Sequence, residues 1–206
     1  MKLFLSSLSI PHPKAYKALF EDKKNVRVAL ICNAWGSYET DKSKPFINAI
    51  IGIFMKMDIQ IEILDLLDYI DRQEKLDELL SGFDGVWITG GNTYYLNWTI
   101  HQAGLDAIIL KHCRNGLVYG GESAGAIVAG PTLKHFETLD NPEDAPMVLL
   151  DGMKLTDTVV VPHFDNPKYG KKTKYIVAQL RAEGFKVLPL NDNQALVVDG
   201  GCLKVL

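Results

Sequence analysis

The segment 119–126, which reads YGGESAGA, constrains the fold of this chain more than any other. The apolar residues 116–119 before it predict a short buried strand, and the small residues 124–129 after it predict the first turns of a helix. Ser123 lies between them, with Gly121 two residues before it and Gly125 two residues after it. This spacing is typical of a nucleophile elbow, a tight strand-to-helix turn that lifts a serine hydroxyl clear of its neighbours. The alternative is a plain glycine-rich turn in which Ser123 only caps the helix.

Strands and helices are predicted to alternate along most of the chain, which predicts an α/β fold of three layers. Its sheet is mostly parallel and carries helices on both faces, and residues 1–206 form one domain. The end of the chain is rich in predicted strands, and the sequence DGG at 199–201 predicts a hairpin between the last two. The expected strands cover 3–5, 26–31, 59–64, 86–89, 116–119, 158–161, 186–190, 195–198 and 202–206.

The stretch between the second and third strands predicts a loop and then a helix. Residues 33–43 are polar and contain glycine, which is typical of a loop. Pro45 is expected in the first turn of the helix that follows, where a missing backbone N–H costs nothing. The apolar residues of that helix recur at helical spacing, so they are expected to face the core. They are Phe46, Ile50, Ile53, Phe54 and Met57.

Charge and cysteine content narrow the class of protein. The net charge is −3 and no basic block occurs, which argues against nucleic-acid binding or attachment to an anionic membrane. No apolar run reaches the length of a membrane span, and the N-terminus lacks a signal-peptide pattern. Cys32, Cys113 and Cys202 are odd in number and widely spaced, so we expect free thiols in the cytoplasm. No Cys/His cluster has metal-ligand spacing, and nothing in the sequence fixes the oligomeric state.

The residues with catalytic potential follow predicted strands directly. Gly90 and Gly91, Ser123 and His163 each come at the carboxyl end of a strand, where sites of parallel sheets lie. His163 is the histidine in that position, since the other four fall in helices or loops. A serine needs a base to act as a nucleophile near neutral pH. We therefore expect His163 to take the proton of Ser123.

Two further elements of a serine-hydrolase site have candidates. The carboxylate that orients the histidine is Asp140, Asp165 or Asp192, all in loops, and the residues alone leave the choice open. The oxyanion is expected to be held by the N–H of Ala124 and by that of Gly90 or Gly91. The alternative for the glycine pair Gly90 and Gly91 is a simple strand-to-helix turn in which Thr93 caps the helix.

Glu122 immediately precedes the expected nucleophile. It is interpreted as a surface residue, with a hydrogen-bonding role near the site as the alternative.

Four short stretches together resemble peptidase E, the aspartyl dipeptidases, and the resemblance runs in order along essentially the whole chain. They are ITGGNT at 88–93, GESAGA at 121–126, GPT at 130–132 and PHF at 162–164. The resemblance implies a class I glutamine-amidotransferase-like fold with serine in place of the usual cysteine. It implies Ser123 as nucleophile, His163 as base, and cleavage of short peptides after an N-terminal aspartate. It implies neither a metal ion nor an organic cofactor.

The resemblance also bears on the remaining site residues. The family's carboxylate after the elbow helix falls near Asp140, displaced by a residue or two, and its acidic residue near the C-terminus falls on or beside Asp192. Asn92 is expected to contact substrate. Lys174 stands where the family has an arginine, and it is expected to bind the substrate's aspartate side chain, more loosely than a bidentate arginine would. Two other functions stay open: hydrolysis of another acidic isopeptide, as in cyanophycinase-like proteins, and a binding module without turnover.

Overall fold

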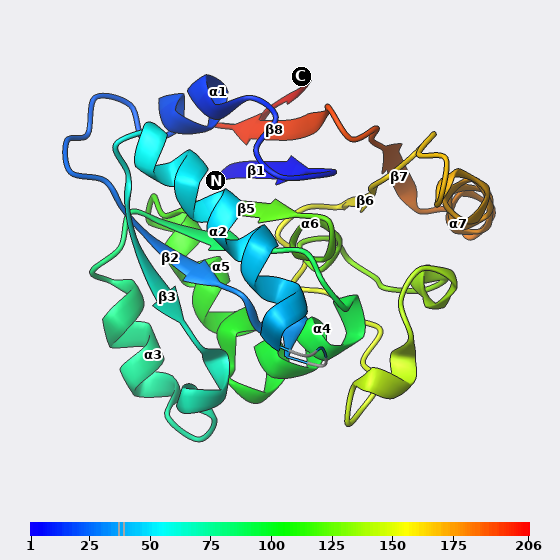
Figure 1. Cartoon of the computed structure of the whole chain (residues 1–206), viewed down its shortest axis with the longest axis horizontal. Coiled ribbons are helices and arrows are strands. Elements are labelled where there is room, and N and C mark those ends of the chain that lie inside the picture. Colours follow the sequence, from blue (N-terminus) through cyan, green and yellow to red (C-terminus); the bar gives the residue numbers. More distant parts are fainter. Residues whose placement is uncertain (37, 39) are drawn as a thin grey trace.

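A computed structural model describes residues 1–36, 38 and 40–206, and a seven-stranded sheet forms its centre (Figure 1). The strand order is β3-β2-β4-β5-β1-β8-β9. The first five strands in this order are parallel, whereas β8 and β9 run antiparallel and form the predicted hairpin. The strands are β1 Lys2–Ser6, β2 Arg27–Ile31, β3 Gln60–Leu64, β4 Gly85–Ile88, β5 Val118–Glu122, β8 Ala195–Asp199 and β9 Cys202–Val205. The predicted α/β fold with a mostly parallel sheet is confirmed.

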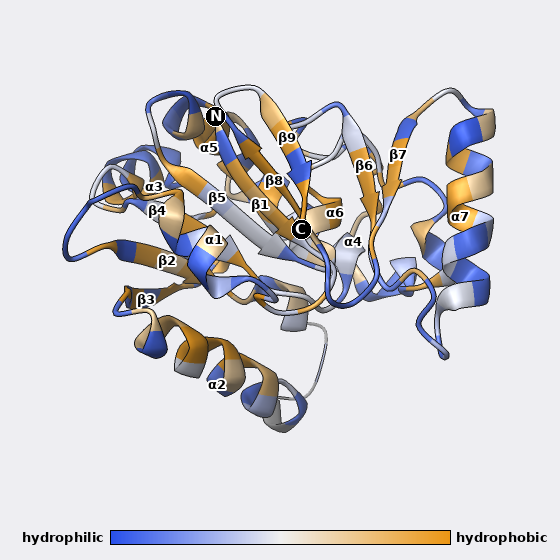
Figure 2. Ribbon diagram, turned by 90° about the horizontal axis from the view of Figure 1, so that it is seen from above, coloured by the Kyte–Doolittle hydropathy of each residue, from blue (hydrophilic) through white to orange (hydrophobic). Residues whose placement is uncertain are grey.

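Helices cover both faces of this sheet, and each face has its own apolar core (Figure 2). One face packs against α1 (Pro13–Ala18) and α2 (Thr40–Lys56), around the buried rings of Tyr16, Phe54 and Trp87. The other face packs against α3 (Gln73–Leu80), α4 (Thr93–Gln102), α5 (Leu105–Arg114) and α6 (Ala124–Ile127). These two cores follow from strands such as β4, which is buried along its whole length.

A second, two-stranded parallel sheet lies beside the main one. It consists of β6 (Thr158–Val161) and β7 (Lys186–Pro189), joined by α7 (Gly170–Ala182). Figure 1 shows this unit on the right, apart from the main sheet. The sequence predicts these two strands but not their separate pairing, because periodicity identifies a strand but not the strand with which it pairs. The consequence for the site is that residues following β6 and β7 reach it from a separate sheet.

The start of α2 differs from its prediction. The helix begins at Thr40, so residues 40–43 of the expected loop 33–43 are helical. Residues 37 and 39 of that loop lie outside the described residues. Pro45 therefore lies in the second turn rather than the first, where only one turn of helix precedes its missing N–H. Phe46 is not a core residue: its side chain is 58% exposed, whereas Ile50, Phe54 and Met57 are buried.

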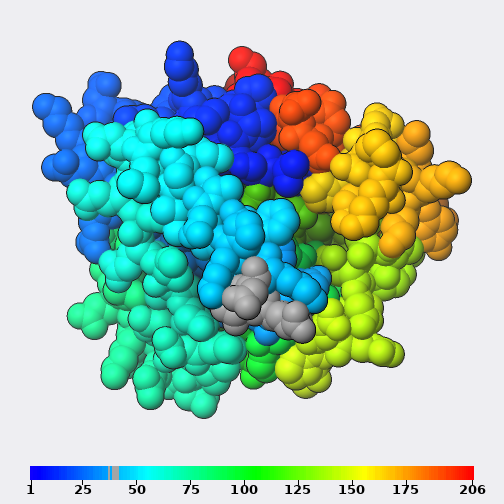
Figure 3. All heavy atoms as spheres, in the orientation of Figure 1, coloured from blue at the N-terminus to red at the C-terminus, as the bar shows by residue number. Residues whose placement is uncertain are grey.

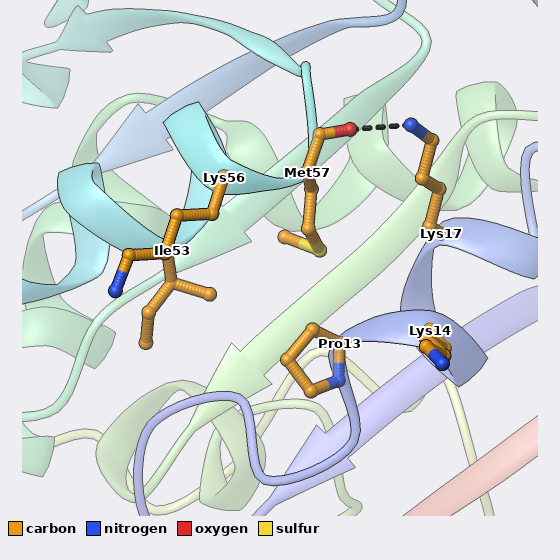
Figure 4. A pocket seen from close by; sticks show the side chains of 6 residues that line it. All are labelled: Pro13, Lys14, Lys17, Ile53, Lys56 and Met57. Carbon is orange, nitrogen blue, oxygen red and sulfur yellow. Dashed lines mark hydrogen bonds between the residues drawn. The ribbon is translucent and has the colours of Figure 1, made fainter.

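A surface pocket lies between α1 and α2 (Figure 4). It shares no lining residue with the cavity beside Ser123 and His163. Lys17 spans the pocket by donating a hydrogen bond from Nζ to the carbonyl oxygen of Met57.

Across the described residues, no helix is both long enough and apolar enough to cross a bilayer.

Candidate active site

The turn at Ser123 has the geometry that the sequence pattern predicts. The residue adopts φ +49° and ψ −112°, a conformation that is costly for a residue with a side chain. Its N–H donates to the carbonyl of Ser6 at 3.0 Å. The flanking glycines are needed for close packing: a Cβ on Gly121 would lie 2.4 Å from the carbonyl oxygen of Gly125, and a Cβ on Gly125 would lie 2.2 Å from that of Ile88. The surrounding backbone therefore holds Ser123 in a strained position between β5 and α6.

His163 lies beside this serine. It follows β6 directly, and its Nε2 is 3.0 Å from the Oγ of Ser123. Its Nδ1 is 2.6 Å from Oδ1 of Asp192, which lies in the turn between β7 and β8. A carboxylate on Nδ1 fixes the tautomer that leaves Nε2 free to accept a proton. The structure thus brings Ser123, His163 and Asp192 into one hydrogen-bonded row.

Asp192 is held by two residues that sequence reasoning missed. The hydroxyl of Ser7 donates to Oδ1 at 2.9 Å, and the amide of Asn166 donates to Oδ2 at 2.7 Å. Partial burial raises the pKa of Asp192, but the hydrogen bonds from Asn166, His163 and Ser7 outweigh it, so the pKa is lowered overall. Ser7 also accepts the N–H of His163 at 2.7 Å. The only sequence signal for Ser7 is that it follows β1 directly, at the same sheet edge as Ser123.

The other two candidate carboxylates lie elsewhere. Asp140 accepts hydrogen bonds at Oδ2 from the N–H and the hydroxyl of Thr93, at 3.0 and 2.5 Å, and burial raises its pKa. It faces the same cavity as Ser123 but is not hydrogen-bonded to His163. Asp165 forms an exposed ion pair with Lys174 at 3.3 Å. Of the three candidates, Asp192 is the one in contact with the imidazole.

The glycine turn after β4 packs against the nucleophile. A Cβ on Gly90 would lie 3.1 Å from the Cβ of Ser123, and a Cβ on Gly91, whose φ is +139°, would lie 2.4 Å from the carbonyl oxygen of Ala34. The N–H of Gly90 interacts with the carboxylate of Glu122. Among the described residues, no acceptor is found for the N–H of Gly91 or of Ala124. These two N–H groups are therefore available to an oxyanion.

The interpretation of Glu122 as a surface residue is wrong. Because β5 continues to Glu122 and pairs it with Ser6, the side chain is only 8% exposed. Its carboxylate accepts the N–H of Ser9 and interacts with that of Gly90. Burial raises the pKa of Glu122 to about 7, although both backbone groups oppose this. Glu122 thus ties the loop after β1 to the glycine turn.

This burial predicts a pH-dependent stability. Because the folded protein retains the Glu122 proton up to about pH 7 and the unfolded chain loses it near 4.5, the folded state binds more protons in between. The free energy of unfolding should fall as the pH rises from 5 to 8, by roughly 3 kcal/mol from this group. Urea unfolding at about pH 5 and at about pH 8 measures this change in the free energy of unfolding. Glu122→Gln should remove most of the difference; Glu78→Gln, at an exposed helix position, should leave it unchanged.

A cavity of about 440 Å³ opens beside the row, and the space-filling view shows the surface hollowed between the start of α2 and the C-terminal part of the chain (Figure 3). Its lining is mostly apolar and aromatic, with three carboxyl groups from Glu122, Asp140 and Asp192. Within the part of the chain that the structure describes, no group of three or more His, Cys, Asp or Glu side chains is arranged to hold a metal ion.

The two residues expected to bind substrate do not line this cavity. Asn92 is fully buried, and its Oδ1 caps α4 by accepting the N–H groups of Tyr94 and Tyr95, both at 2.9 Å. Its amide donates to Asn141 and Asp144. The Lys174 side chain is 62% exposed and its ammonium pairs with Asp165. Both residues thus make contacts with the protein itself, and their expected contact with substrate stays a prediction.

Comparison with known proteins places this chain in a family. Residues 11–206 match the model of "Peptidase family S51". The chain is 30% identical over 150 residues to the uncharacterized peptidase Lin0382 of Listeria innocua, covering 72% of this chain and 67% of the relative. It is 31% identical to a peptidase E of Nostoc sp., covering 67% of this chain and 55% of that protein.

Solved structures show the same fold. The crystal structure of a candidate peptidase E protein from Listeria monocytogenes EGD-e superposes with a TM-score of 0.86 at 24% identity, covering 100% of this chain and 97% of that one. A peptidase from an acI-B1 actinobacterium superposes with a TM-score of 0.76 at 18% identity, covering 100% and 86%. The chain therefore belongs to peptidase family S51 and is a hydrolase of the peptidase class.

Proposed function

We propose that this protein is a serine peptidase that hydrolyses short peptides, with Ser123 as nucleophile, His163 as base and Asp192 as the carboxylate that orients the base. The observation that carries the proposal is the row in which Oγ of Ser123, the imidazole of His163 and the carboxylate of Asp192 are linked by contacts of 3.0 and 2.6 Å. Both distances are within the range needed for proton transfer and orientation.

The chemical steps follow from these positions. As Oγ of Ser123 attacks the scissile carbonyl carbon, Nε2 of His163 takes the hydroxyl proton, and the N–H groups of Gly91 and Ala124 hold the developing oxyanion. The C–N bond then breaks, and the leaving amine receives the proton from His163. Water, deprotonated by the same imidazole, hydrolyses the acyl-enzyme and restores Ser123. Throughout, ionised Asp192 stabilises the imidazolium from the Nδ1 side.

The expected substrates are short because the cavity is small and partly enclosed by side chains. The preference for an N-terminal aspartate is supported by the sequence resemblance and by relatives that carry the name peptidase E. The cavity itself gives it no support, since none of the described lining residues is a lysine or an arginine. Cleavage of other acidic linkages, the second candidate function, lacks support for the same reason. The three free cysteines favour the cytoplasm as the site of action.

A labelling experiment tests the serine mechanism independently of substrate choice. The pure protein is incubated with a fluorophosphonate probe, with and without a metal chelator, and the labelled peptide is identified by mass spectrometry. We expect stoichiometric labelling at Ser123 that the chelator does not affect, and at least a hundredfold slower labelling in His163→Ala, because the base is removed. Labelling elsewhere, or none, would exclude Ser123 as the nucleophile.

A further inference from the structure

The charges that face the cavity have one sign. Asp140 and Asp192 contribute carboxylates, whereas burial raises the pKa of the Glu122 carboxyl group to about 7. Among the described lining residues none carries an ammonium or guanidinium group. An aspartate side chain brought into this space would lose its hydration and meet carboxylates rather than a cation. A protonated α-amine, by contrast, would be attracted by the carboxylates of the cavity. The electrostatics of the cavity therefore favour a substrate whose first residue has a protonated α-amine and an uncharged side chain.

Asp140 offers a specific partner for such an amine. Both hydrogen bonds from Thr93 go to its Oδ2, and no partner is found for its Oδ1 among the described residues. The carboxyl group lines the cavity and lies close enough to His163 for the two charges to interact. Because Asp140 is anchored at one oxygen and open at the other, it can accept a hydrogen bond from an ammonium group without rearrangement.

An aromatic shelf forms another part of the lining. We define it as Trp35, Tyr38 and Phe46, which come from the short helix 33–35, the segment after it and α2. The rings of Trp35 and Phe46 stack with centroids 5.1 Å apart and planes 21° apart, and Tyr38 lies 5.4 Å from Trp35. Tyr38 and Phe46 are nevertheless 39% and 58% exposed. An ordered aromatic cluster that stays exposed beside a nucleophile is typical of a binding surface for an apolar group.

From these three features we propose that the site selects peptides whose first residue is apolar or aromatic and whose α-amine is protonated, and that it discriminates against an N-terminal aspartate. The shelf holds the first side chain, and Asp140 holds the amine. This inference rests on the proposed serine-peptidase function and specifies its substrate class.

The test compares kcat/KM for Phe-Leu, Ala-Leu, Asp-Leu and N-acetyl-Phe-Leu. We expect Phe-Leu to exceed Asp-Leu at least tenfold, and N-acetylation to lower the value by a similar factor, because the cation is lost. Phe46→Ala should lower kcat/KM for Phe-Leu about tenfold, mainly through KM, and leave Ala-Leu within twofold. Met55→Ala is the matched control, since Met55 is 72% exposed on the same helix and does not line the cavity.

Asp140→Asn provides a second, independent variant. It removes the negative charge but keeps an acceptor for Thr93, so the Phe-Leu to Asp-Leu ratio should narrow at least threefold. If wild type cleaves Asp-Leu faster than Phe-Leu, the proposed selectivity is overturned while the serine mechanism stands. If no dipeptide is cleaved and Ser123 is not labelled by a fluorophosphonate, the proposed function itself fails, and this inference with it.

Discussion

Replacing Ser123 with alanine is expected to lower kcat/KM for dipeptide hydrolysis by about 10⁴-fold or more, because no other group can form the acyl-enzyme. The residual rate should come only from substrate binding and the N–H groups of Gly91 and Ala124. Initial rates of amino-acid release, measured at several enzyme concentrations, give the value. Alanine must adopt the same positive φ as Ser123, so the melting temperature should stay within a few degrees of wild type.

The matched control is Ser81→Ala. The Ser81 hydroxyl donates to the carbonyl oxygen of Glu78 in its own helix turn, and Ser81 does not line the cavity. This variant should keep full activity. A Ser123→Ala protein that folds normally and retains more than a few per cent of wild-type activity would show that another residue, or water activated by His163 alone, performs the attack.

The second large effect is expected for Asp192→Asn, which should lower kcat by 10²- to 10⁴-fold. Asn166 can only donate to this side chain, because its own oxygen accepts the N–H of Lys168, so the asparagine oxygen must take the place of Oδ2. The NH₂ group then takes the place of Oδ1, where it points toward Nδ1 of His163 and toward the Ser7 hydroxyl, which can accept from it. An NH₂ donor at Nδ1 forces the proton onto Nε2, and the imidazole can no longer accept the Ser123 proton. The steady-state parameters should show this as a loss in kcat with KM changed little.

Asp140→Asn separates the two carboxylates. Because Asp140 is bonded to Thr93 and not to the imidazole, its substitution should change KM and selectivity more than kcat. If Asp140→Asn lowers kcat more than Asp192→Asn does, Asp192 is not the orienting carboxylate. The pH dependence of kcat supplies an independent readout, since loss of the carboxylate bonded to Nδ1 should shift the ionisation of His163 more than loss of the Asp140 charge.

Local sequence signals predict the parts of this site that depend on short-range geometry. The spacing of Gly121, Ser123 and Gly125 specifies a turn whose packing requires those glycines, and His163 is placed by the strand directly before it. The carboxylate that completes the row with Ser123 and His163 could not be chosen from local sequence signals. Asp192 reaches His163 only because the β7–β8 turn folds back over the end of β6, a contact across 29 residues.

Other predictions failed because burial depends on where a strand or helix ends. Glu122 is buried since β5 runs three residues beyond the expected end at 119. Phe46 is exposed since α2 begins before Pro45 and turns that side chain toward the cavity. By contrast, the expected contact of Lys174 with substrate stays a prediction, since the structure shows only that its ammonium pairs with the exposed carboxylate of Asp165. The fold class needed none of these details, because the alternation of strand and helix patterns determines it.

The catalytic row is shared between two sheets that are not hydrogen-bonded to each other as strands. Ser123 and the glycine turn belong to the main sheet, whereas His163 and Asp192 are carried by the β6–α7–β7 unit, and Ser7 bridges the boundary. Sliding one unit against the other by about an ångström would break the Ser123–His163 contact while leaving the strand pairing within each sheet intact. Mild heating or a low concentration of denaturant should therefore abolish the activity under conditions where circular dichroism still shows a folded protein. Activity is then a more sensitive measure of the native arrangement than spectroscopy.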